Sequence, residues 1–120
     1  MLSKPLGVGE DGSLMSTADR AGAIVDDVAN HRYVLEEDGL VAELIYRRNG
    51  NRLILVHTEV PEKLGGRGIG GQLVRHALER AAAEHLTVVP WCPYARKWLQ
   101  DHPDVAATVT IDWTLPPAPA

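Results

Sequence analysis

The glycine-rich segment at residues 65–71 has the residue types and spacing of a phosphate-binding turn. It follows a β-branched apolar run over residues 53–60 and leads into an amphipathic helix, in the order Gly65-Gly66-Arg67-Gly68-Ile69-Gly70-Gly71. Because glycine carries no Cβ, backbone N–H groups at the start of that helix stay open to an anionic ligand. The spacing predicts a pyrophosphate cradle at Gly66–Gly71, although glycine-rich turns also serve as plain strand-to-helix connections.

Two common phosphate-binding motifs do not fit this segment. An NTPase P-loop would end in Gly-Lys-Ser/Thr, whereas Gly70 is followed by Gly71 and Gln72. A dinucleotide-binding turn belongs near the start of a larger parallel sheet, whereas here antiparallel strands are predicted first.

Cys92 is the second candidate for chemistry. Pro93 suits the first turn of a helix, which puts Cys92 at or next to the helix N-cap. We expect the helix dipole, together with Arg96 and Lys97 one turn later, to lower the pKa of the thiol toward neutrality. A thiolate is a competent acyl acceptor; a small apolar residue packed between neighbouring tryptophans is the alternative interpretation.

His57 and Glu59 stand two positions apart on the predicted strand before the loop. Strict alternation places Leu53, Leu55, His57 and Glu59 on one face and Ile54, Val56, Thr58 and Val60 on the other. Beside the cradle, either His57 or Glu59 could take a proton from an incoming ammonium group. A solvent-facing pair on a half-exposed strand is the alternative.

The elements that must hold these residues follow from the apolar periodicity and the turns. We expect an α/β domain with a mixed (α+β) sheet: an antiparallel meander, then a strand–helix–strand crossover, then a C-terminal helix. The expected strands span residues 32–36, 40–48, 53–60, 86–89 and 105–113, and the expected helices span residues 16–28, 68–84 and 93–101. Asp38-Gly39 and Asn49-Gly50 are the predicted hairpin turns.

Three motifs in order resemble the GNAT superfamily of acyl-CoA N-acyltransferases. Gly68-Ile69-Gly70 is similar to the second half of its Gln/Arg-x-x-Gly-x-Gly/Ala loop, with Gly65 where the family has Gln or Arg and Arg67 as a substitute cation. His57-Thr58-Glu59-Val60-Pro61 and Cys92-Pro93-Tyr94-Ala95-Arg96-Lys97-Trp98-Leu99 resemble segments of a very small, cysteine-containing GNAT-like subfamily. The resemblance covers residues 24–104.

The resemblance implies a cofactor, acetyl-CoA, and an unidentified amine acceptor. It also implies that the strand before the loop splays from its parallel neighbour, so that the backbone at Thr58 and Val60 binds the pantetheine arm and polarises the thioester carbonyl. By the same resemblance, Cys92 lies near the acetyl group and Tyr94 protonates the departing CoA thiolate. Direct attack by the amine is the mechanism that the superfamily generally uses, with Cys92 then positioning the acyl group rather than carrying it.

Composition narrows the class of protein. The chain has 120 residues, a formal net charge of −4 and one cysteine, so we expect one small domain with no nucleic-acid surface and no disulfide. The histidines make no recognisable ligand spacing with Cys92, and no metal is expected. Without a signal or membrane-spanning segment, we expect a cytoplasmic monomer or weak homodimer with mobile tails at residues 1–16 and 116–120.

Two other functions fit the same motifs. A non-catalytic acyl-CoA-binding module would bind the cofactor without turnover, and Gly65 in place of Gln or Arg favours it. A small interaction domain, in which the loop only joins a strand to a helix, would not bind CoA at all.

Overall fold

The computed structural model describes residues 23–116 and shows a six-stranded mixed sheet in the order β1-β2-β3-β4-β5-β6. Its elements are β1 (Ile24–Asp27), the 3₁₀ turn η1 (Val28–Asn30), β2 (Arg32–Glu37), β3 (Leu40–Asn49), β4 (Arg52–Glu59), the 3₁₀ turn η2 (Glu62–Leu64), α1 (Ile69–Glu84), β5 (Thr87–Pro90), α2 (Pro93–Asp101), α3 (Pro103–Ala106) and β6 (Thr110–Ile111). β1 to β4 are antiparallel, whereas β5 and β6 each run parallel to the preceding strand. The predicted α/β fold with a mixed sheet is confirmed.

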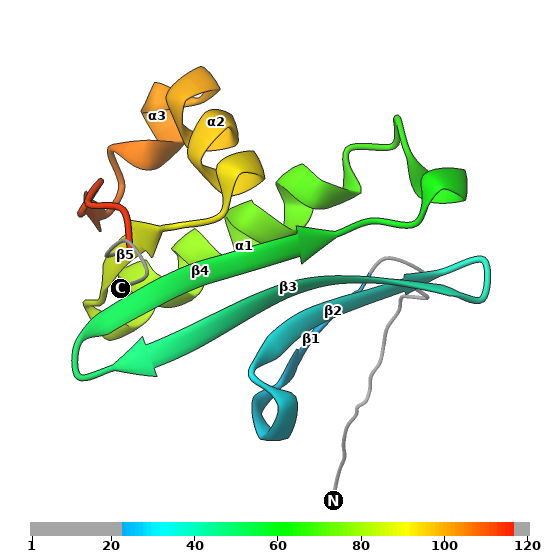
Figure 1. Cartoon of the computed structure of the whole chain (residues 1–120), viewed down its shortest axis with the longest axis horizontal. Coiled ribbons are helices and arrows are strands. Elements are labelled where there is room, and N and C mark those ends of the chain that lie inside the picture. Colours follow the sequence, from blue (N-terminus) through cyan, green and yellow to red (C-terminus); the bar gives the residue numbers. More distant parts are fainter. Residues whose placement is uncertain (1–22, 117–120) are drawn as a thin grey trace, which may run out of the picture.

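One face of the sheet carries the core. Figure 1 shows α1 along the sheet, with α2 and α3 beyond the end of β5. The core side chains from α1 are Ile69, Leu73, Val74, Ala77, Leu78 and Ala81, and those from the strands include Leu35, Leu44, Leu53, Leu55 and Val88. β2 and β3 alternate between buried and more exposed residues, as expected for an antiparallel meander packed on one side.

The parallel pairing of β4 with β5 ends early. It extends from Arg52 to Leu55 on β4, opposite Thr87 to Pro90 on β5. The Leu55 carbonyl then accepts from the N–H groups of both Trp91 (3.0 Å) and Cys92 (2.9 Å). Beyond this point β4 remains paired with β3 as far as Glu59, while its other edge faces no strand among the described residues.

A bulge in β4 decides which side chains face the helices. The pairing with β3 shifts between Leu55 and His57, so Val56 is an extra residue with no partner on β3. An extra residue reverses the alternation of the side chains that follow it. Leu55 and Thr58 therefore both face the helices, and His57 faces away from them.

The strict alternation predicted for β4 is thus wrong beyond the bulge. We expected His57 and Glu59 to share a face with Leu55, but they lie on the opposite, exposed face. Thr58 and Val60 lie on the helical face instead. Val56 is an ordinary strand residue, so nothing in its identity signals the bulge.

Two predictions near the ends of the domain are also wrong. The predicted helix ending at Val28 is replaced over its described part by β1, because Ile24 pairs with Leu35 and packs against the core. The predicted strand over residues 105–113 is limited to Thr110–Ile111, because Pro103 starts the short helix α3. Residues 1–22 and 117–120, which include most of the two predicted tails, lie outside the described residues.

The C-terminal segment is bound to the sheet through β6. The N–H of Asp112 donates to the Val88 carbonyl (2.8 Å), and its carboxylate accepts from Arg52 (2.6 Å). Val109 and Ile111 pack partly buried against the core. These contacts make β6 a structural part of the domain.

We predict that a chain ending at Thr108 melts at least about 5 °C below the full chain, because it loses β6 and the apolar contacts of that segment. Thermal unfolding followed by circular dichroism measures this shift. A chain ending at Pro116 is the control and is expected to melt like the full chain. Equal melting of all three chains would mean that β6 does not contribute to stability.

Candidate functional site

A cavity of 280 Å³ opens between the free edge of β4 and the start of α1. It is lined by Thr58, Val60, Leu64, Gly65, Gly66, Gly68, Ile69, Gly70 and Tyr94. Strand edge, glycine-rich turn and helix N-terminus therefore face one space, at the place where β4 has left β5.

The backbone of the turn keeps its amides open to a ligand. Gly66 and Gly68 have φ of +80° and +74°, and a Cβ on either would meet nothing within 4 Å. Gly68 is the N-cap of α1, and no side chain caps this helix in the described structure. The N–H groups of Ile69 and Gly70 therefore keep the anion-binding capacity of an uncapped helix start.

Gly70 and Gly71 have a packing role that sequence reasoning missed. A Cβ on Gly70 would come within 2.6 Å of the Tyr94 hydroxyl, and a Cβ on Gly71 within 2.5 Å of Trp98 Nε1. Only glycines allow α2 to lie this close to the first turn of α1. Gly71, predicted to bind the cofactor, faces Trp98 and does not line the cavity.

Leu64 is a lining residue that the sequence prediction omitted. It is almost fully buried and belongs to η2, so it anchors the turn to the core. A single leucine between Pro61 and the glycines is the signal that could have indicated this anchor.

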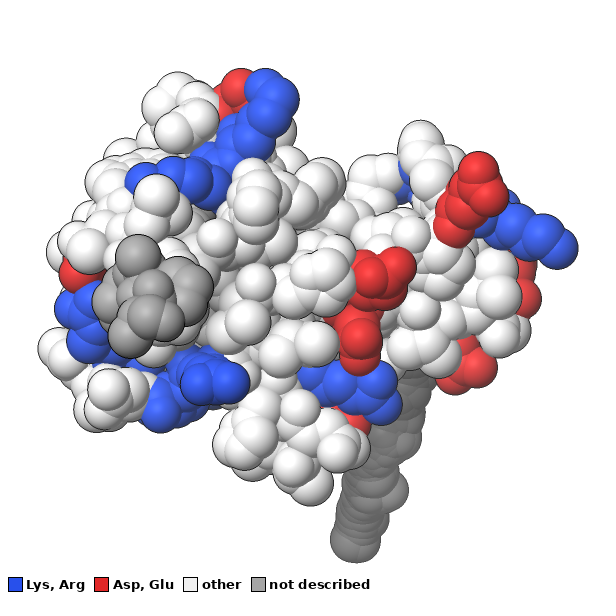
Figure 2. Space-filling view, in the orientation of Figure 1, with Lys and Arg blue, Asp and Glu red and all other residues white. Residues whose placement is uncertain are grey.

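Arg67 also lies outside the cavity lining. Its guanidinium donates to Glu37 (2.6 Å) and Asp38 (2.8 Å) at the β2–β3 turn. Figure 2 shows acidic side chains gathered mainly on the half of this face that carries the β2–β3 turn and the loop before α1. Arg67 thus links the glycine-rich turn to the β2–β3 hairpin and neutralises part of the negative charge of its two carboxylates.

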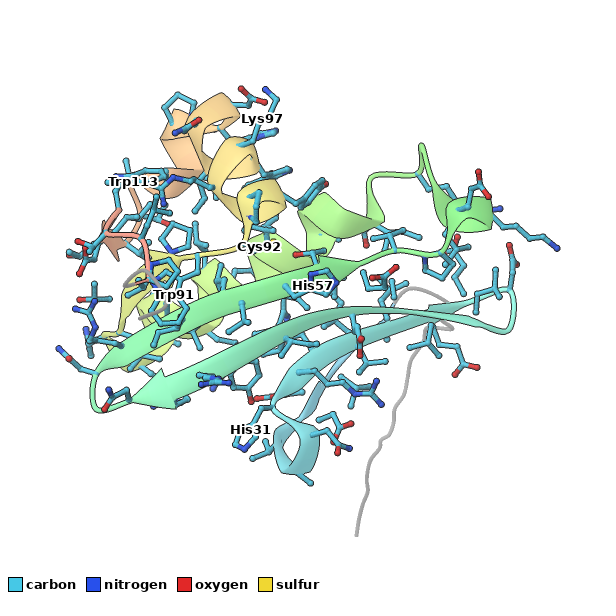
Figure 3. The ribbon with its side chains drawn as sticks, viewed as in Figure 1. His31, His57, Trp91, Cys92, Lys97 and Trp113 are labelled. Atoms are coloured by element: carbon cyan, nitrogen blue, oxygen red, sulfur yellow. The ribbon has the colours of Figure 1, made fainter. Side chains whose placement is uncertain are left out.

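Cys92 is the N-cap of α2, as predicted, and its side chain is buried. Its Sγ lies 3.3 Å from the Thr58 hydroxyl oxygen. Figure 3 shows Cys92 where the chain leaves β5 toward α2, close to β4. The structure therefore brings together two of the predicted site residues, Cys92 and Thr58, although Cys92 does not line the cavity.

The two cations expected to act on Cys92 are engaged elsewhere. Arg96 donates to the carbonyls of Pro90 (3.0 Å) and Trp113 (2.5 Å). Lys97 pairs with Asp101 (3.0 Å) and projects from the outer side of α2, away from Cys92 (Figure 3). Neither supplies a cation in contact with the sulfur.

Tyr94 lines the cavity with its ring against Gly70, and its side chain is partly exposed. Burial raises the pKa of Tyr94, and the electrostatic effect of the neighbouring Cys92 side chain raises it further. A phenol with a raised pKa keeps its proton at neutral pH and can act as a hydrogen-bond donor or general acid.

His57 and Glu59 form a pair on the exposed face of β4. His57 Nε2 donates to Glu59 Oε1 (3.0 Å), with 56% and 64% of the two side chains exposed. Neither lines the cavity, so an acceptor would have to approach them from the outer side of the sheet.

Residues 23–116 hold no group of three or more His, Cys, Asp or Glu side chains placed to bind a metal ion. Among the described helices, none has the length and apolar character needed to cross a membrane.

Comparisons with known proteins agree with this architecture. A family model described as GCN5-related N-acetyl-transferase matches residues 32–109. Protein NATD1 of Homo sapiens is 38% identical over 63 residues, which are 52% of this chain and 56% of NATD1. Protein NATD1 of Gallus gallus is also 38% identical, over 52% of this chain and 57% of its own length. The chain thus spans a little over half the length of the curated relatives it matches.

The solution NMR structure of a GCN5-like protein from Staphylococcus aureus has a similar fold. The two structures agree with a TM-score of 0.61 at 23% identity, covering 77% of this chain and 91% of the other. The resemblance seen in the motifs is confirmed by the family match, which extends from β2 past α3. Since that match covers more than half of the sequence, the chain belongs to the GCN5-related N-acetyltransferase family.

Proposed function

We propose that this protein binds acetyl-CoA in the cavity beside β4 and transfers the acetyl group to an amine on a small molecule or a protein. The observation that carries the proposal is the cavity itself, which joins an unpaired strand edge to an uncapped, glycine-rich helix start. A pyrophosphate needs the amides of such a helix start, and an extended amide-bearing arm needs such an edge.

The residues around the cavity fit the parts of this cofactor. The amides of residues 66–70 suit the pyrophosphate, because Gly66 and Gly68 leave open space where other residues would place a Cβ. The backbone at Thr58 and Val60 suits the pantetheine arm, because the edge of β4 there has lost its β5 partner. When bound, acetyl-CoA would supply an activated acyl group as a thioester.

The protein's side chains divide the proton transfers between the two faces of the sheet. Tyr94, on the helical side, holds a proton that it can give to a departing thiolate. His57 and Glu59, on the outer side, can take the proton that an ammonium acceptor must lose before its nitrogen can attack. Because β4 has no β5 partner beyond Leu55, an acceptor on the outer face and an acyl group on the helical face would meet at this strand edge.

A binding function without turnover is the second candidate. The exposed pair His57–Glu59 lies outside the cavity lining, so within residues 23–116 neither candidate base borders the space proposed for the acyl group. Gly65 also replaces the Gln or Arg side chain of the usual loop. Stoichiometric acetyl-CoA binding with no CoA release from a panel of amines would favour this candidate.

We predict that Gly68→Asp weakens acetyl-CoA binding at least tenfold, to about one-tenth of the wild-type affinity or less, because it adds a negative charge and a side chain at the helix start. Isothermal titration calorimetry measures the dissociation constant. Gly50→Asp is the matched control, since Gly50 also has a positive φ (+61°) and open space around its Cβ position but lies in the β3–β4 turn. Unchanged affinity in a folded Gly68→Asp protein would contradict the assignment of the cradle.

We predict that Tyr94→Phe lowers kcat for CoA release by about 100-fold and leaves KM nearly unchanged, because the phenol acts only on the leaving sulfur. Since the pKa of Tyr94 is raised, any loss of rate from its ionisation falls above about pH 10, the ordinary phenol value. This fall in kcat at high pH is expected to be absent in Tyr94→Phe, which has no phenol to ionise.

The matched control for Tyr94→Phe is Tyr46→Phe. This change removes a phenol hydroxyl that donates a hydrogen bond to Asp26 on β1 (2.7 Å). Tyr46 does not line the cavity. If both variants lose rate equally, the loss at Tyr94 reflects general destabilisation and not acid catalysis.

A further inference from the structure

We propose that the hydroxyl of Thr58 donates a hydrogen bond to the thioester carbonyl oxygen of the bound acyl group, and that the thiol of Cys92 holds this hydroxyl in position. The proposal rests on the proposed function, because it needs a thioester in the cavity. It makes Thr58 a catalytic residue and Cys92 a positioning residue.

The position of Thr58 is the first step. The bulge at Val56 turns Thr58 to the helical face, where it lines the cavity next to Val60. It stands on the first part of β4 that lacks a β5 partner, close to the point where the strands separate. An acyl group at the end of an arm lying along this edge therefore passes the Thr58 side chain.

The contact with Cys92 fixes the hydroxyl. Thr58 Oγ1 lies 3.3 Å from Cys92 Sγ, and Cys92 is only 2% exposed. Because threonine is β-branched, its χ1 angle has few allowed values, so one contact is enough to hold the rotamer. Cys92 itself is held by the bond from its N–H to the Leu55 carbonyl (2.9 Å).

The donors and acceptors available on Thr58 and Cys92 indicate the direction of the hydrogen bond between them. A hydroxyl has one proton to donate and two lone pairs, whereas a thiol is a weak donor. Among the described residues, Thr58 Oγ1 is the one hydrogen-bond partner seen for Cys92 Sγ. When the S–H donates to Oγ1, the hydroxyl proton is free to point into the cavity and donate to a carbonyl oxygen.

The donated bond would act on charge that grows during transfer. As the amine nitrogen bonds to the carbonyl carbon, negative charge develops on the carbonyl oxygen, and a fixed donor stabilises it. The carbon–sulfur bond then breaks and the sulfur takes the Tyr94 proton. The nitrogen gives its surplus proton to the outer pair, His57 and Glu59. Thr58 keeps its own proton throughout, and Cys92 is not acylated.

The experiment compares Thr58→Val, which removes only the hydroxyl, with Thr58→Ser, which keeps it. Infrared difference spectra of bound acetyl-CoA, labelled with ¹³C at the acetyl carbonyl, report the hydrogen bond directly and need no turnover. We expect the carbonyl band to move to higher frequency in Thr58→Val and to stay near the wild-type position in Thr58→Ser. Thr87→Val is the matched control, since it makes the same change on β5, away from this cavity.

Kinetics and calorimetry give the second measurement. We expect Thr58→Val to lower kcat to about one-tenth or less, while KM and the affinity for acetyl-CoA stay nearly unchanged. Thr58→Ser is expected to keep most of the wild-type rate. Cys92→Ala is expected to broaden the carbonyl band and to lower kcat in part, because the Thr58 hydroxyl is no longer held in one position. Cys92→Ser is expected to keep a narrow band and most of the rate, since a serine hydroxyl can also donate a hydrogen bond to Thr58.

Each outcome bears on a different claim. Absence of acetyl-CoA binding to the wild-type protein would overturn the proposed function. Binding with the same carbonyl band in wild type and Thr58→Val would overturn this inference alone. Intact-mass and peptide mapping that finds an acetyl group on Cys92, discharged by added amine at the rate of turnover, would also overturn it, because Cys92 would then carry the acyl group.

Discussion

The separation of β4 from β5 is the feature on which the site depends. Parallel pairing stops at Leu55 opposite Pro90, and the Leu55 carbonyl then accepts from the amides of Trp91 and Cys92. These bonds turn the chain out of the sheet and start α2, while β4 continues beside β3. One strand edge is thereby left open next to the start of α1, and the cavity lies at that junction.

The glycines of the turn serve two needs that usually fall to different residues. Gly66 and Gly68 supply left-handed backbone and leave space for a ligand, whereas Gly70 and Gly71 let α2 approach α1. The second need explains why the run of glycines extends into the helix, where glycine is otherwise unfavourable. Because Tyr94 rests on Gly70, the same contact that joins the two helices also places a phenol beside the uncapped amides.

The bulge at Val56 divides the chemistry of β4 between the two faces of the sheet. Thr58 faces the cavity and contacts Cys92, while His57 and Glu59 face outward. The hydroxyl and thiol groups near the open edge therefore lie on one side of β4, and the titratable pair lies on the other.

Local signals in the sequence were enough to predict the meander, the crossover helix and the glycine turn, because each depends on residues close together in the chain. Asp38-Gly39 forms the β2–β3 turn as predicted, and the apolar spacing after Gly68 matches α1. The β3–β4 turn lies at Gly50-Asn51, one residue later than the predicted Asn49-Gly50, because Asn49 still pairs with Arg52. Whether Thr58 or His57 faces the helices was decided only by the register of β4 against β3, which no local pattern encodes. The same holds for Cys92, whose contact with Thr58 joins residues far apart in sequence, and for β6, whose extent depends on where α3 ends and β5 offers an edge.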